Sequence, residues 1–485
     1  MGKSCCGNHA KMPRRHFLGA LGTTVAGAAA LSSRGVLASR PTAGQASARK
    51  RGTATVRGAF VYPSTESLRK AGYYSWPGAG FDAEGHHRQY ADGITAIARR
   101  LDMRIAMNEK PLHDAASVTR FIKEVKDQPP DGLLLIPLKK HDWDSVIRIV
   151  DESGTPTVAF TTLGVLRNIE INKLSRRPGV HVISSLDNLD ALERGMRMIK
   201  TARWMRESRI VSLAGSATKD TIVQNLGTQV WGLPRERFAE EFRRTKATTE
   251  VRDIARTYLK NARKVVEPSD ADVLDAAKTY VACKRILDRE QGDAIMIECL
   301  GGIRERRFAP PCMGFMSLRD EGIAAGCEND LNATLTLMLL QQLFDRPGFM
   351  QNCSSETEKN HYVGAHCTCP TKLNGPSGPS EPYILRNHAE AGVGVAPQVL
   401  WRTGQEVTMT RYFAGEKPEM IVYSGKVVRC YNTPPAGGCR TNVELTINEV
   451  DDVGDVKGNH MTIIYGNYAK QLRVFCQLYG ITVVT

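Results

Sequence analysis

Strand-length apolar runs that alternate with helical segments are the feature that most restricts the fold of this chain. The run DGLLLIPL (131–138) has the length of a strand, and DSVIRIVDES (144–153) after it has helical spacing. Strands buried on both faces and separated by helices predict a parallel, doubly wound sheet. The alternation starts near residue 55 and restarts at RIVSLAG, so we expect two α/β domains, at 55–200 and 201–372.

The alternation of strand-like and helical segments ends near residue 372. LNGPSGPSEP (373–382) is a Gly/Pro/Ser-rich linker, and QEVTMTRYF, EMIVYSGKVVRC and HMTIIYG after it are typical of strands joined by short turns. We therefore expect a mostly β domain at 382–485. No G-x-G-x-x-G follows a first strand, so a dinucleotide site has no support.

The first 48 residues carry six Lys or Arg and no Asp or Glu, and removing these six lowers the formal net charge from +14 to +8. A twin arginine, Arg14–Arg15, precedes an uncharged Gly/Ala-rich run from Phe17 to Leu31 that is too short and too weakly apolar to span a bilayer. This order predicts a twin-arginine export signal over 1–48. We expect an extracytoplasmic mature protein without stable membrane insertion, or a cytoplasmic one if the leader is not used.

Charges of both signs are mixed through the rest of the chain, which argues against nucleic-acid binding. The cysteines lack a framework spacing, so a structural or redox protein built on them is the least favoured class. Cys430 and Cys439 bracket YNTPPAGG. A disulfide that closes this loop and two buried thiols are both open alternatives.

Three distant residues form a candidate metal site. Glu328 stands just before a predicted helix over 331–344, His366 ends YVGAH, and His460 in GNHMTIIYG opens an apolar strand. One carboxylate and two imidazoles suit a divalent ion such as Mn²⁺, Fe²⁺, Co²⁺ or Zn²⁺. For a lone histidine such as His460, a hydrogen-bonded core position is the plain alternative.

The segments that carry these residues are more specific than their spacing. SLRDEGIAAGCENDLNATLTLMLLQQL, GFMQN, YVGAHCTCP, GQEVTMTRYF and the closing GNHMTIIYGNYAKQLRVFCQLYGITVV together resemble the L-fucose isomerase and L-arabinose isomerase family, over about residues 290–485. The chain is similar to a divergent, fucose-isomerase-like branch. The resemblance implies a homo-oligomer in which a Mn²⁺-type ion binds an open-chain sugar, and a carboxylate moves a proton between carbons 1 and 2 through an enediol.

Carried over by position, the resemblance makes Glu328, His366 and His460 the metal ligands. The family's second carboxylate is expected in GFMQN, where this chain has Gln351 and Asn352. An amide cannot accept a proton near neutral pH, so another acid must act if isomerisation is retained. Asp330, which also fits a helix cap, is our catalytic candidate beside Glu328, and Glu298 and Glu356 are alternatives. Candidate substrate-binding residues are Gln351, Trp76, His86 and Arg411.

These observations predict a metal-dependent enzyme that acts on sugars, with aldose–ketose isomerisation, an intramolecular oxidoreduction, as the expected reaction. Two alternatives remain. One is an exported sugar-binding protein, since two α/β domains behind an export signal also describe periplasmic binding proteins. The other is a degenerate isomerase homologue that retains binding only, because the second acid is missing.

Overall fold

The computed structural model describes residues 51–70, 81–138, 143–163, 165, 168–175, 177–431 and 438–485. Residues Ala46–Thr485 form one compact unit. The predicted export signal and Trp76 lie outside the described residues. None of the helices in the described ranges has both the length and the apolar character needed to cross a bilayer.

The first sheet is parallel throughout, as its buried strands predict, and has the order β2-β1-β3-β4-β5. Helices α2 and α6 share one hydrophobic core with it, and α3 and α4 share another. Its strands are β1 (Ala54–Val61), β2 (Met103–Met107), β3 (Gly132–Pro137), β4 (Thr157–Thr161) and β5 (Val180–Ser184); its helices are α1 (Thr65–Lys70), α2 (Ala83–Arg100), α3 (Ala115–Asp127), α4 (Trp143–Ser153), α5 (Asn168–Ser175) and α6 (Leu189–Arg206).

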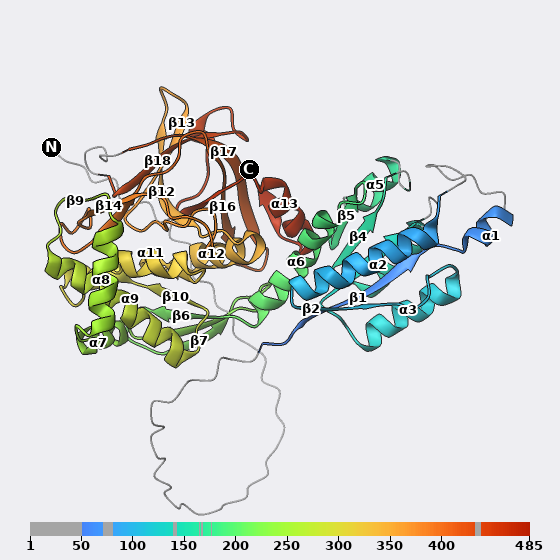
Figure 1. The fold of residues 1–485 in the computed structure, drawn as a ribbon, viewed down its shortest axis with the longest axis horizontal. Coiled ribbons are helices and arrows are strands. Elements are labelled where there is room, and N and C mark those ends of the chain that lie inside the picture. The colour runs from blue at the N-terminus through green and yellow to red at the C-terminus, as the bar shows by residue number, and fades with distance from the viewer. Residues whose placement is uncertain are drawn as a thin grey trace, which may run out of the picture. The chain divides into compact units, whose positions relative to one another are not determined.

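The second sheet has the order β11-β10-β6-β8-β7, with only its edge strand β7 antiparallel (Figure 1). The α/β character predicted for both regions is thus confirmed. The strands are β6 (Arg209–Leu213), β7 (Lys219–Ile222), β8 (Gln229–Leu233), β10 (Ala294–Ile297) and β11 (Ala324–Gly326); the helices are α7 (Glu236–Arg244), α8 (Thr249–Asn261), α9 (Asp270–Glu290), α10 (Cys299–Arg304), α11 (Cys312–Asp320) and α12 (Leu331–Phe344), with the 3₁₀ turn η1 (Cys327–Asn329).

The mostly β region is an antiparallel barrel. Its strands pair in the order β16-β19-β12-β13-β18-β17, and a β16–β17 pairing closes the ring. Two of its strands precede the linker at 373–382, so the barrel begins earlier in the chain than the predicted β domain, whose boundaries stay a prediction. The strands are β12 (Phe349–Glu356), β13 (His361–His366), β16 (Glu406–Phe413), β17 (Glu419–Cys430), β18 (Thr441–Ile447) and β19 (Met461–Tyr465).

Smaller elements complete the fold around the barrel. Helix α13 packs on β17 and on the edge strand β5 of the first sheet. A small sheet of order β15-β14-β9 is separate from the ring, and its strand β15 contacts β18. The elements are β9 (Lys264–Val265), β14 (Tyr383–Arg386), β15 (Ala396–Val399), η2 (Val453–Asp455), α13 (Ala469–Leu478) and β20 (Thr482–Val484).

Helix α12 links the second sheet to the barrel. It contacts β10 and β11 on one side and β16 and β19 on the other. Leu335, Met338, Leu339 and Leu343 are buried along one face of this helix, and most of its remaining positions are buried as well. A helix that is apolar all round belongs in a core, so α12 holds its N-terminus rigidly where sheet and barrel meet.

The carboxylate of Glu444 on β18 is buried in the barrel wall and is 1% exposed. It accepts hydrogen bonds from His361 Nδ1 (2.7 Å), Arg429 Nε (2.6 Å) and the Tyr431 hydroxyl. Burial by itself raises the pKa of Glu444, but these three donors outweigh it and lower the pKa to about 2.

Glu444→Gln is therefore expected to lower the free energy of unfolding at pH 7 by about 3 kcal/mol. Because the folded pKa lies below the ordinary value, this stability is present above about pH 4.5 and is lost as the pH falls toward 2. Urea unfolding of both proteins between pH 7 and pH 3 measures the difference, which should shrink over that window. Glu406→Gln, at an exposed barrel position, is the matched control and should change stability little. A difference independent of pH would contradict the explanation.

Candidate metal centre

Glu328, His366 and His460 converge on one point of the structure. His366 Nε2 lies 3.4 Å from Glu328 Oε1, and His460 Nε2 lies 3.5 Å from Glu328 Oε2. One ligand atom from each residue lies within 4.8 Å of the other two, and the imidazole rings are 5.8 Å apart at 76°. A carboxylate and two imidazoles at this spacing can hold a divalent ion.

Three different elements deliver these side chains. Glu328 lies in η1, which follows the carboxyl end of β11 in the second sheet and precedes α12. His366 is the last residue of β13, and His460 immediately precedes β19. The predicted placement of Glu328 before a helix and of His460 at the start of a strand is thus confirmed. Ligands of α/β proteins commonly bind at the carboxyl ends of the strands, and here the barrel supplies the facing side.

The backbone is strained at the ligands themselves. Glu328 (φ 56°), Asn329 (φ 54°) and His460 (φ 51°) all adopt the left-handed conformation. Ser212 Oγ donates to Asn329 Oδ1 at 2.8 Å, which helps to fix the turn. At Gly326, just before the turn, a Cβ would overlap Thr334 Oγ1. Strain of this kind persists only where the surroundings impose it, and it clusters at functional sites.

The imidazole atoms that face Glu328 are suited to a metal. His460 Nδ1 donates to Asp330 Oδ2 at 2.8 Å, which leaves the lone pair of a neutral ring on Nε2. His366 is 4% exposed, and its Nε2 has no hydrogen-bond partner among the described residues. A buried polar atom without a partner is costly, and an ion at this point would supply the partner.

The charges of the three residues depend on one another. The His366 imidazole, 3.4 Å from Glu328 Oε1, lowers the pKa of Glu328, and burial opposes this shift. Burial lowers the pKa of His366, but the neighbouring Cys327 and Glu328 outweigh it and raise the pKa to about 10. Without an ion the carboxylate is thus neutralised by a protonated imidazole, and a divalent cation would replace that proton.

Asp330 and Arg411 form an ion pair that is hydrogen-bonded to His460. Asp330 caps α12 by accepting from the Ala333 N–H at 2.9 Å, and Arg411 Nη2 binds both of its oxygens at 3.0 and 2.9 Å. Arg411 Nη1 donates to the backbone carbonyl of His460 at 3.0 Å. Burial by itself raises the pKa of Asp330. The hydrogen bonds that Asp330 accepts from His460 Nδ1 and the Ala333 N–H, together with the guanidinium of Arg411, outweigh burial and lower this pKa to about 2. The pair therefore orients the His460 imidazole.

Comparison with known proteins gives one weak likeness to enzymes. No protein-family model matches the chain. Sulfoquinovose isomerases from Priestia aryabhattai and Priestia megaterium are each 23% identical to it over 214 residues, or 42% of this chain and 46% of theirs. The chain thus matches about half the length of these curated relatives. The likeness supports a distant relationship to a sugar isomerase.

One solved structure shows a very weak similarity to this chain. It is titled a sugar ABC transporter from Yersinia enterocolitica subsp. enterocolitica 8081. It is 13% identical with a TM-score of 0.17, and the match covers 61% of this chain and 80% of that chain.

The remaining predicted site residues lie elsewhere. Gln351 is fully buried in the barrel, where its amide exchanges hydrogen bonds with the Tyr362 hydroxyl at 2.7 and 3.0 Å. His86 lies on α2, where its Nδ1 is 2.8 Å from the Asp82 carbonyl, and no contact joins it to the metal ligands within the described ranges. The structure thus places Gln351 in a packed core and His86 on a separate helix; a substrate-binding role for either stays a prediction.

The alternative acids also have structural partners. Glu298 caps α10 by accepting from the Gly301 N–H at 3.0 Å, and it pairs with Arg235. Glu356 lies 3.8 Å from Lys359 at the end of β12.

The cysteine alternatives are now distinguished. Cys430 and Cys439 are both free thiols, so the structure contains no disulfide between them. Cys367 and Cys369, which flank Thr368 after His366, are buried. Sequence reasoning missed Cys327, whose thiol borders His366 and whose pKa is lowered by His366 and Arg319 although burial raises it. The signal was available in the sequence, since Cys327 directly precedes Glu328.

Proposed function

We propose that the protein is a metal-dependent aldose–ketose isomerase of sugars. The observation that carries this proposal is the convergence of Glu328, His366 and His460, in which both imidazole Nε2 atoms approach the Glu328 carboxylate, at 3.4 and 3.5 Å. The distant likeness to a sugar isomerase supports the reaction class. Mn²⁺ is the ion that we expect, because the fucose- and arabinose-isomerase resemblance implies it.

A divalent ion held by these residues supplies a Lewis acid for two neighbouring sugar oxygens. The chain must supply the group that takes a proton from carbon 2 of the aldose and returns one to carbon 1, while the hydroxyl proton passes from oxygen 2 to oxygen 1. The Glu328 side chain is 30% exposed, whereas that of Asp330 is 16% exposed and both its oxygens are hydrogen-bonded within the protein. We therefore assign the proton transfer to Glu328 and a positioning role to Asp330.

The test is a metal and turnover measurement on the full chain. Protein loaded with Mn²⁺ should retain about one ion per chain. It should convert an aldose to its ketose in a panel of neutral and anionic sugars, incorporate deuterium from D₂O into the product, and lose turnover with a chelator. Saccharide binding that is indifferent to chelator, with no turnover, would overturn the proposal in favour of an exported sugar-binding protein.

Asp330→Asn is expected to weaken Mn²⁺ binding about 10- to 100-fold, because an amide holds His460 Nδ1–H and Arg411 less strongly than a carboxylate does. Titration of metal-free protein with Mn²⁺ measures the change. Asp345→Asn is the matched control, since Asp345 terminates the other end of α12 and its left-handed backbone suits Asn equally well. Equal Mn²⁺ affinity in Asp330→Asn and the parent protein would contradict the positioning role.

The location and assembly state are proposed on sequence grounds. The twin-arginine leader supports an extracytoplasmic site of action, which fractionation of cells expressing the full chain would test. The fucose- and arabinose-isomerase resemblance supports a homo-oligomer, which light scattering would measure.

A further inference from the structure

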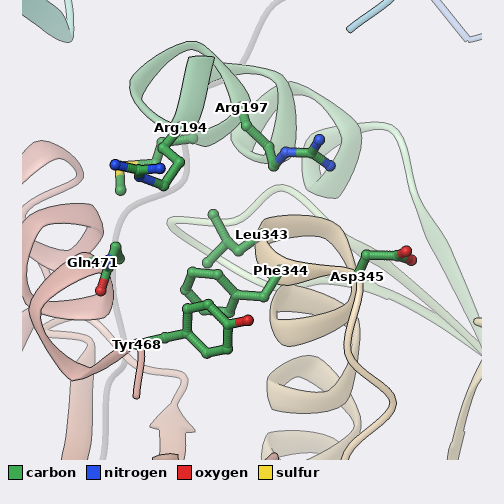
Figure 2. Close-up of a pocket in the computed structure, with 8 residues that line it drawn as sticks. Arg194, Arg197, Leu343, Phe344, Asp345, Tyr468 and Gln471 are labelled. Atoms are coloured by element: carbon green, nitrogen blue, oxygen red, sulfur yellow. The ribbon is translucent and has the colours of Figure 1, made fainter. Parts of the chain in front are cut away.

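Two adjoining cavities lie far from the metal centre, where α6, α12 and α13 meet. The first, of about 290 Å³, lies between β5, α6 and α13. The second, of about 250 Å³, lies between α6, the end of α12 and the start of α13 (Figure 2). They share Arg194, Met198 and Gln471. The second cavity includes Phe344 and Asp345 at the C-terminal end of α12, about 20 Å along that helix from the turn that carries Glu328.

The lining of the first cavity is cationic. Arg194 from α6 and Lys470 from α13 line it, and no Asp or Glu does. Within the described ranges neither cation makes an ion pair. Burial, Lys470 and Arg194 together lower the pKa of His181 on β5 to about 4, so the imidazole is neutral at pH 7 and able to donate a hydrogen bond. Two exposed cations thus line this cavity with no acidic residue beside them in its lining.

Polar groups of the kind that recognise oxyanions surround these cations. Ser184, Ser185 and Asn188 line the cavity where β5 ends and α6 begins. Helix α13 starts at the same cavity, with Gln471 in its first turn, and its N-cap residue Tyr468 makes no capping hydrogen bond through its side chain. The side-chain oxygen of Gln471 is unpartnered among the described residues, so it can accept a hydrogen bond from a donor on the ligand, whereas only the amide N–H can donate to an oxyanion. The Ala469 N–H donates to Asn467 Oδ1 at 3.4 Å, and the N–H groups that follow it at this helix N-terminus favour anions.

The second cavity adds an apolar wall to this cationic one. Phe344 stacks on Tyr468 with ring centroids 4.3 Å apart, and Leu343 and Met198 lie beside them. Figure 2 shows Arg194 and Arg197 projecting from α6 above these rings. The only acid on this wall, Asp345, accepts a hydrogen bond from Gln341 Nε2 at 2.8 Å.

The walls are held in place by direct contacts between α13 and the first sheet. Gln477 Nε2 donates to the carbonyl of Val180 at 2.8 Å, and the Gly179 N–H donates to the carbonyl of Gln477 at 2.9 Å. The cavities are therefore built by packed elements whose backbones are hydrogen-bonded to each other.

From this arrangement we infer a second binding site, for a small molecule that joins an oxyanion group, a phosphate or sulfonate, to a flat or apolar body. The oxyanion sits between Arg194 and Lys470 in the first cavity, and the body lies against Phe344 and Tyr468 in the second. The site is independent of the proposed function, because it shares no residue with the metal centre.

The test uses inorganic phosphate, phenyl phosphate and phenyl sulfonate, titrated into the full chain by calorimetry. Phosphate should bind in the millimolar range, and phenyl phosphate should bind at least about 10-fold more tightly because its ring adds apolar contact. The comparison of phenyl phosphate with phenyl sulfonate identifies which oxyanion the site prefers. Absence of binding by all three probes would overturn the inference.

Variants separate the two halves of the site. Arg194→Gln with Lys470→Gln should weaken phosphate and phenyl phosphate alike, by at least about 10-fold. Phe344→Leu should remove most of the advantage of phenyl phosphate over phosphate and leave phosphate binding unchanged. Lys126→Gln, at an exposed position on α3 without an ion pair in the described part of the chain, is the matched control. Equal binding to the double variant and to Lys126→Gln would also overturn the inference.

Discussion

Glu328→Gln is expected to empty the metal centre and to lower isomerase turnover at least about 1,000-fold. A neutral amide oxygen is a weaker ligand than a carboxylate for a hard divalent ion, and it cannot carry the proton between two sugar carbons. The fold should be retained, because Asp330 and not Glu328 caps α12. Metal analysis after gel filtration should show the bound Mn²⁺ falling from about one ion per chain to less than one tenth.

Glu298→Gln is the informative comparison for this variant. Glu298 also follows a strand of the second sheet, but it caps α10 and pairs with Arg235. We expect Glu298→Gln to keep its metal and most of its turnover. A Glu328→Gln protein with full metal content would contradict the site. Loss of turnover in Glu298→Gln at full metal content would instead make Glu298 the acid that replaces the family's second carboxylate.

Excess Mn²⁺ separates the two roles assigned to Glu328. If it acts only as a ligand, saturating Mn²⁺ should restore turnover in Glu328→Gln. If it also transfers the proton, the ion is restored but turnover stays low, and deuterium incorporation from D₂O is lost with it. We expect the second result, because Asp330 has its oxygens committed to His460, Arg411 and Ala333.

Much of the fold followed from local patterns in the sequence. The run DGLLLIPL contains β3, and the polar-to-apolar change at Asp330 marks the start of α12, because burial and helix capping act over a few residues. The small β7–β8 pair was missed, since the exposed strand Lys219–Ile222 has no apolar alternation. Barrel strands β12 and β13 lie before the linker, within the range predicted for the second α/β domain, and their pairing with β18 and β19 could not be predicted because it is not local.

Of the candidate site, only the three residues that could hold an ion were predictable. Sequence motifs located Glu328, His366 and His460. No short-range pattern in the sequence predicts that His460 donates to Asp330, 130 residues away, or that Arg411 donates to both residues. Arg411 is a partner of Asp330 in the structure, and its predicted substrate-binding role stays a prediction. The left-handed backbone at Glu328 and His460 was also invisible, since neither position has a glycine to mark it.

Arg319 is the buried charge that joins the two ligand-bearing segments. It lies on α11 and is 2% exposed. Its Nε and Nη2 donate to the carbonyl of Ala325 at 2.9 and 2.6 Å, and Nη1 makes longer contacts with the carbonyls of Gly348 and Thr368, at 3.4 and 3.5 Å. Nη2 also lies 3.7 Å from Cys327 Sγ. The guanidinium thus ties the strand before Glu328 to the loop after His366.

Arg319→Met is expected to lower the free energy of unfolding by about 3 kcal/mol. Methionine removes the cost of burying a charge, but the carbonyls that the guanidinium satisfied remain buried, each at about 1–3 kcal/mol. Arg319→Lys keeps the charge and loses the fork geometry, so it should fall between the two proteins. Urea unfolding of the metal-free proteins measures the loss, and an Arg319→Met protein as stable as the parent would contradict it. Mn²⁺ affinity should weaken in parallel, because Ala325 and Thr368 lie within three residues of Glu328 and His366. A site with a strained backbone keeps its geometry only while surrounding contacts such as those of Arg319 hold it in place.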